Sequence, residues 1–202
     1  MLTLISEWVV KRLIVHRAIA EERRDVYRYG CELIVSTASV ALFILLAGLS
    51  SGRFASALIF LLYFMPIRTV AGGYHAPSYG KCFVLTSLTA FICAGGGEFC
   101  SRTGRVAGIF LWIVYGVAQL FIWLRGPFRS RRHPLREDRI AGNRRRMHRM
   151  QILETAVCLS LQAAGREIYL YTAILATTAV AVMIAMAEKE ECGNVGSIGG
   201  SH

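Results

Sequence analysis

Long stretches of this sequence are almost free of charged residues, and they constrain the fold more than any other feature. A helix that crosses about 30 Å of hydrocarbon needs about 20 largely apolar residues, and 54 % of the chain is hydrophobic. The clearest such stretches are residues 33–51, 54–67, 106–124 and 168–187. The sequence therefore predicts an all-α integral membrane protein, a bundle of transmembrane helices.

Hydropathy divides the chain into six predicted spans. They are residues 30–50, 53–70, 81–97, 106–124, 151–165 and 168–187. The fifth is the weakest because it is short and contains Glu154 and Gln162, so half of a re-entrant hairpin is an alternative to a full crossing. The spans form one domain, 30–187, between an N-terminal segment, 1–29, and a polar, Gly-rich tail, 188–202, which is expected to be disordered.

Basic residues outnumber acidic ones by 23 to 13, which gives a net charge of +10. They lie between the apolar runs, so topology and anionic lipid headgroups explain them better than nucleic acid, which is not expected as a partner. With the N-terminus in the cytoplasm, 19 of the 23 lie on the cytoplasmic side, ten of them arginines of the loop 125–150. The positive-inside rule thus predicts cytoplasmic termini and a cytoplasmic loop between the second and third spans.

The N-terminal segment lacks both an uninterrupted apolar core and a small-residue cleavage site, so it does not read as a signal peptide. Leu2, Ile5, Val9 and Leu13 recur at helical spacing with basic residues among them. This pattern predicts an amphipathic helix in the membrane interface. A helix packed against the rest of the protein fits the periodicity equally well.

One polar segment, residues 68–82, differs in kind from the runs around it and reads RTVAGGYHAPSYGKC. His75 supplies a base and Cys82 a nucleophile, but seven residues of continuous helix would separate them by about 10.5 Å. The glycines and Pro77 would let the chain fold back so that imidazole and sulfur meet. Cys82 would begin the third span, where the helix dipole and Lys81 favour the thiolate.

Several other interpretations of this segment remain open. A histidine and a cysteine at a membrane boundary also occur by chance, and H-x6-C is not a usual zinc spacing, so no metal is expected. Arg68 could grip a substrate carboxylate or extend to the headgroups. A small channel or transporter and an anionic-lipid-binding scaffold are the non-catalytic alternatives, although neither accounts for the GGYH run. The six cysteines form no CxxC pair, and those outside the segment read mainly as packing residues.

The segment resembles the accessory gene regulator B (AgrB) family of bacterial membrane peptidases. The resemblance is carried by Arg68, by residues 72–76 (GGYHA) and by Cys82, and it extends over residues 1 to about 187 through span count and the basic N-terminus. It implies a cysteine peptidase, a thiol protease of the bacterial cytoplasmic membrane, with its active site at the cytoplasmic face. The basic loop departs from the family in being rich in arginine where more lysine is expected.

The same resemblance implies roles for individual residues. Cys82 would be the nucleophile and His75 its general base, with no cofactor. Arg68 and Gly73 would be required for the site. The remaining supporting or substrate-binding positions are Gly72, Tyr74 and Lys81.

The implied substrate is an AgrD-type propeptide with an amphipathic leader, a central cysteine or serine and an acidic tail. Cys82 would expel the tail and hold the rest as a thioester, which the internal nucleophile converts into a cyclic thiolactone or lactone quorum-sensing peptide. Candidate contacts to the acidic tail are Arg129, Arg131, Arg132 and Arg136. The positive-inside bias alone would produce the same basic loop. A homodimer is left open.

Overall fold

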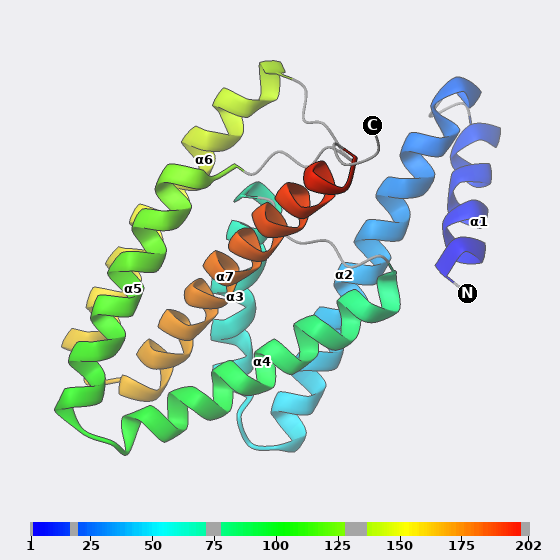
Figure 1. Cartoon of the computed structure of the whole chain (residues 1–202). Helices are drawn as coiled ribbons and strands as arrows, with labels where there is room; N and C mark the ends of the chain where they lie inside the picture. Colours follow the sequence, from blue (N-terminus) through cyan, green and yellow to red (C-terminus); the bar gives the residue numbers. More distant parts are fainter. Residues whose placement is uncertain (1, 17–19, 72–77, 128–136, 199–202) are drawn as a thin grey trace.

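The computed structural model describes residues 2–16, 20–71, 78–127 and 137–198, and every element in it is helical. The elements are α1 (Leu2–Val15), η1 (Glu21–Arg23), α2 (Arg24–Ser50), α3 (Phe54–Ala71), α4 (Tyr79–Ser101), α5 (Arg105–Arg125), α6 (Glu137–Ala163) and α7 (Glu167–Ile198). Figure 1 shows α1 beside α2 at one edge of the bundle and α5 and α6 at the opposite edge. The all-helical membrane fold predicted from the sequence is confirmed.

Helix α7 lies at the centre of the bundle and packs against α3, α4, α5 and α6. In its most apolar 18-residue stretch 67 % of the residues are buried, against at most 39 % in the other four candidate spans. Its buried side chains alternate between small and large ones, among them Ala173, Ile174, Ala176, Val180 and Ile184. Small residues let helix backbones approach closely, which is the main source of packing energy where lipid surrounds the protein.

Tight turns join the helices at one end of the bundle, the lower end in Figure 1. Gly52 has a φ of 70° and Gly165 a φ of 66°, a region that only glycine enters at little cost. The amides that follow bond back across the last helical turn, from Arg53 to the carbonyl of Gly48 (2.7 Å) and from Arg166 to that of Leu161 (2.9 Å). Consecutive helices therefore run in opposite directions.

Five helices are long and apolar enough to cross a membrane, namely α2, α3, α4, α5 and α7. The fifth predicted span, 151–165, falls in α6, which is not among the five. This helix is unbroken over 27 residues and runs antiparallel to α5 and α7 (Figure 1), so the predicted span covers only the later part of the helix. The reason is that hydropathy detects only the apolar half of the helix, whereas the basic half before it is equally helical.

The polar residues of α6 contact neighbouring helices. The side-chain amide of Gln151 donates to the backbone and side-chain oxygens of Gln119 in α5 (2.9 and 2.6 Å), and Gln162 accepts a hydrogen bond from Trp112 (3.2 Å). On the α3 side, the hydroxyl of Tyr63 donates to the backbone oxygen of Glu154 (3.1 Å). The polar residues that lower the hydropathy of α6 therefore also bind this helix to its neighbours in the bundle.

The two ends of the chain also extend helical structure. Helix α1 packs along α2, where Val10 and Ser6 are fully buried while Trp8 is exposed. Helix α7 continues to Ile198, so the backbone is helical over most of the tail predicted to be disordered. Glu188 to Glu191 read EKEE, all good helix formers, and they follow the last apolar turn without a break.

Gly97 in α4 lies against the α7 backbone, and Gly97→Ala is expected to destabilise the fold. A Cβ there would lie against the hydroxyl of Thr172, 2.8 Å from its amide nitrogen and 2.9 Å from the carbonyl of Ile168. Backbone cannot give way as a flexible side chain can, so we expect a loss of about 3 kcal/mol in the free energy of unfolding. SDS-induced unfolding in mixed micelles measures it. Gly95→Ala is the matched control, since its Cβ would meet nothing within 4 Å, and equal losses for both variants would contradict the prediction.

Candidate active site

The ends of α3 and α4 bring Arg68 and Cys82 into contact. One guanidinium nitrogen of Arg68 (Nη2) donates to Cys82 Sγ at 3.4 Å. The other (Nη1) donates to the hydroxyl of Thr86 at 2.9 Å. Cys82 is half-buried and lies fourth in α4, and Thr86 follows it one helical turn later. The planar guanidinium thus spans two successive turns of α4.

The guanidinium is held from the α3 side as well. Its carbon lies 5.3 Å from the centre of the Phe64 ring, one turn earlier in α3. Phe64 is fully buried and stacks on Phe60. A cation over an aromatic face in a poorly hydrated site is attracted by roughly 2 kcal/mol. Arg68 therefore points into the bundle towards Cys82.

The first turn of α4 is capped by its own sequence. Ser78, in an extended conformation, accepts a hydrogen bond from the Lys81 amide through its hydroxyl (3.3 Å) and from the Cys82 amide through its carbonyl (3.1 Å). The amides of Tyr79 and Gly80 belong to the first turn and have no acceptor within the helix. Lys81 is exposed. The start of α4 therefore presents two backbone donors one turn away from the thiol.

A second contact fixes this turn to α2. The hydroxyl of Tyr79 donates to one carboxylate oxygen of Glu32 (2.9 Å), and the buried hydroxyl of Ser6 in α1 donates to the other (3.3 Å). Glu32 thus joins α1, α2 and the start of α4. The start of α4 is therefore held to α3 through Arg68 and to α2 through Tyr79.

Sequence reasoning identified Arg68, Lys81 and Cys82 but missed Thr86, Phe64 and Glu32 as parts of this arrangement. Thr86 lies four residues after Cys82 in an otherwise apolar run, and that spacing is the signal that could have found it. Glu32 is distant in sequence, and nothing local connects it with residue 79.

Most other predicted site residues fall outside the described residues. They are His75, Gly72, Gly73 and Tyr74 between α3 and α4, and Arg129, Arg131, Arg132 and Arg136 between α5 and α6. The described residues on either side are Ala71, which is fully buried, and Ser78, which is exposed. No cluster of three or more potential metal ligands occurs among the described residues.

Comparisons with known proteins identify the family of the chain. The family model described as "Accessory gene regulator B" matches residues 3–186. "Putative AgrB-like protein 2" of Clostridium perfringens is 24 % identical over 139 residues, 67 % of this chain and 64 % of that protein. The chain thus spans less than two thirds of the length of this curated relative. No solved structure matches the chain. Nearly the whole membrane bundle lies within the match, and the chain belongs to the accessory gene regulator B family, which is involved in the processing of quorum-sensing peptides.

Proposed function

We propose that this chain is a membrane cysteine endopeptidase that removes the acidic tail of an AgrD-type propeptide and promotes cyclisation of the remainder. The contact between Arg68 and Cys82 (3.4 Å) carries the proposal, because a packing cysteine needs no cation aimed at its sulfur. Membership of a peptide-processing family gives the substrate class.

The proposed reaction begins with attack of the Cys82 thiolate on the scissile carbonyl. The C–S bond forms, the C–N bond breaks, and the leaving amine takes the proton that His75 removed from the thiol. The substrate's internal thiol or hydroxyl then attacks the thioester and gives its proton to His75. Cys82 leaves as a thiolate, and a cyclic peptide is released.

Two features at the start of α4 support this chemistry. The guanidinium of Arg68 stabilises negative charge on the sulfur, both before attack and when the thioester is opened. The amides of Tyr79 and Gly80, which have no acceptor within the helix, are suited to bind the oxyanion that forms on the scissile carbonyl. A half-buried position limits the access of water, which favours the internal nucleophile over hydrolysis.

The proposed topology places this site at the cytoplasmic face. Helices α3 and α5 end, and α4 and α6 begin, away from the tight turns (Figure 1), and the arginines of early α6 lie at that end. At the tight-turn end, Arg53 and Arg102 both pair with Glu98 (2.5 and 2.6 Å), which reduces the positive charge there. Ion pairs occur at the other end as well, where Arg125 pairs with Glu188 (3.5 Å) and Arg28 with Glu7 (3.9 Å), so the proposed orientation rests on the number of Lys and Arg residues at each end.

The decisive experiment looks for the acyl-enzyme. The purified chain in proteoliposomes is mixed with a propeptide that has an amphipathic leader, one internal cysteine and an acidic tail, then quenched in acid. Mass spectrometry should find an adduct equal to the propeptide without its tail, on the peptide that contains Cys82 and removable by hydroxylamine. Tail release with no adduct there, and with no inhibition by prior alkylation of the thiol, would reject the proposal.

Thr86→Val tests the second contact of the guanidinium. Valine keeps the shape but removes the oxygen that accepts from Arg68 at 2.9 Å, so the guanidinium loses one of its anchors beside Cys82. A hydrogen bond to a charged group contributes about 1.5 kcal/mol, and we expect the rate of tail release to fall about tenfold. Thr89→Val is the control, since the Thr89 hydroxyl bonds only within its own helix, to the carbonyl of Leu85 (2.7 Å). Similar rates for the two variants would show that the Thr86 contact is dispensable.

A further inference from the structure

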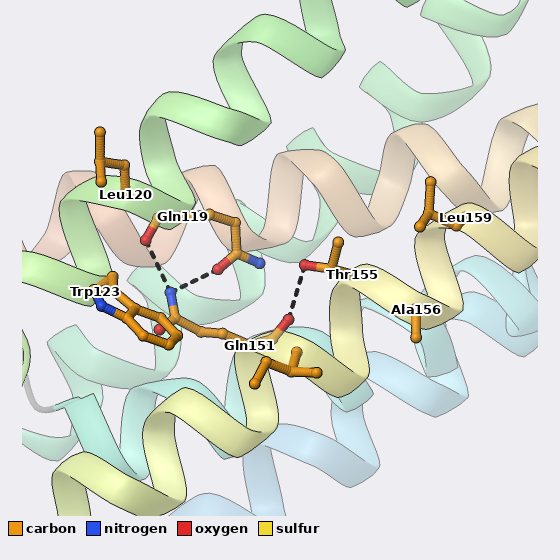
Figure 2. A pocket seen from close by; sticks show the side chains of 8 residues that line it. Gln119, Leu120, Trp123, Gln151, Thr155, Ala156 and Leu159 are labelled. Carbon is orange, nitrogen blue, oxygen red and sulfur yellow. Dashed lines mark hydrogen bonds between the residues drawn. The ribbon is translucent and has the colours of Figure 1, made fainter.

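A groove of about 630 Å³ lies between α5 and α6, on the side of the bundle away from the start of α4 (Figure 1). Its walls carry Leu120, Ile152 and Leu159, all exposed apolar side chains. Gln119, Gln151 and Thr155 line its floor, where their polar groups hydrogen-bond to one another or to the backbone (Figure 2), so the surface open to a ligand is almost wholly apolar. An apolar groove on the outer surface of a membrane bundle faces lipid, so its occupant must suit that environment.

One end of the groove combines an aromatic ring with unsatisfied polar atoms. Trp123 lies there, near the end of α5, and its ring stacks on that of His148 with centroids 3.6 Å apart. Gln151 is 3 % exposed and its Oε1 atom has no hydrogen-bond partner among the described residues. The same holds for Nε2 of His148. Buried polar atoms without a partner are rare in proteins, and these two lie at the tryptophan end of the groove.

Beyond this end the α6 face becomes basic. Arg149 and Arg145 precede Ile152 by three and seven residues and therefore lie on the same helical face as that wall of the groove. Both are exposed, and neither has an acidic partner among the described residues. Arg125, at the end of α5, pairs instead with Glu188 (3.5 Å). The apolar walls, the ring of Trp123 from α5, the polar side chains and the two arginines of α6 thus follow one another from the groove towards the start of α6.

The length of the groove indicates that its occupant is a lipid chain rather than a helix. Gln151 to Leu159, the extent of its α6 wall, rises about 12 Å along the helix. Half the hydrocarbon thickness is about 15 Å, which one acyl chain fills, whereas a membrane-spanning helix needs about twice that length. We propose that this groove is a specific site for an anionic phospholipid, with an acyl chain along Ile152 and Leu159, its ester region beside Trp123 and its phosphate on Arg145 and Arg149.

Quenching of Trp123 by lipids with brominated acyl chains tests the site. A chain with Trp8→Phe and Trp112→Phe, so that Trp123 is the only tryptophan, is reconstituted in phosphatidylcholine nanodiscs with brominated phosphatidylglycerol or brominated phosphatidylcholine. Two arginines at a membrane surface should give the anionic lipid roughly a 30-fold preference at low salt. Arg145→Gln with Arg149→Gln should abolish this preference.

Two controls separate the site from general attraction to the surface. Arg146→Gln with Arg166→Gln removes the same charge from another face of α6 and from the turn between α6 and α7, and should leave the preference unchanged. Ala156→Phe fills the groove and should protect Trp123 from both brominated lipids, while Val157→Phe, which does not line the groove, should not.

Four results would overturn the inference. Equal quenching by the two lipids would remove the headgroup specificity, and an equal effect of the control arginine pair would leave only surface charge. Absence of quenching by either lipid would mean that protein, such as a second copy of the chain, fills the groove. Arginine changes that slow peptide processing but spare the lipid preference would assign Arg145 and Arg149 to an acidic peptide.

Discussion

A chain in which Cys82 is replaced by alanine is expected to release no propeptide tail, with a loss in rate of roughly 10⁴-fold or more. The thiol is the group to which the acyl portion is transferred, and alanine offers no atom that can form the bond. The Arg68 guanidinium and the free amides of α4 would still bind the substrate, so the loss should appear in kcat rather than in KM. The measurement is single-turnover release of a fluorescent tail from the propeptide in proteoliposomes.

Other cysteines of the chain provide the controls for this prediction. Cys31 in α2 and Cys100 at the end of α4 are also partly exposed, yet neither lies beside a guanidinium among the described contacts. Cys31→Ala and Cys100→Ala should therefore retain nearly full activity. Cys82→Ser keeps the shape but is a far weaker nucleophile, and it should unfold at the same detergent concentration as the wild type. Processing that survives in Cys82→Ala would mean that another group is the nucleophile.

The membrane fold could be predicted because its determinants are local. Runs of apolar residues fix where helices cross the membrane, and each predicted boundary of the third and fourth spans lies within four residues of α4 and α5. Hydropathy does not detect the part of a helix that lies outside the hydrocarbon. The helical structure of the basic half of α6 and of the polar end of α7 was therefore not predicted. Those parts depend on helix propensity and on packing against neighbours.

The candidate site could be predicted only in part, for a related reason. Cys82 and Arg68 were found because they stand out from an apolar background within one short segment. The contacts that position them come from residues whose separation in sequence hides their proximity, such as Glu32, 47 positions from Tyr79. Which face of α3 meets α4 depends on how the helices pack, and a single sequence does not contain that information in readable form.

The second large effect is expected from Arg68→Lys, which keeps the positive charge but removes the planar guanidinium with its two separate donor nitrogens. Two nitrogens of the guanidinium donate to Cys82 Sγ (3.4 Å) and to Thr86 Oγ1 (2.9 Å) at the same time. The lysine side chain is shorter and has a single ammonium group, so it cannot make both contacts. Loss of an oriented donor at a developing charge typically costs about a hundredfold in rate, and we expect that loss here.

Alkylation of Cys82 by iodoacetamide, measured without any substrate, separates a role in positioning the sulfur from a role in folding. The rate should fall in Arg68→Lys if the guanidinium stabilises the thiolate, whereas a loss of fold would expose the thiol and raise it. Arg53→Lys, the same exchange at the Glu98 ion pair at the other end of the bundle, should change neither alkylation nor processing. Arg68→Lys with unchanged alkylation but lost processing would instead indicate that Arg68 binds the substrate, because only the reaction with peptide would then depend on the guanidinium.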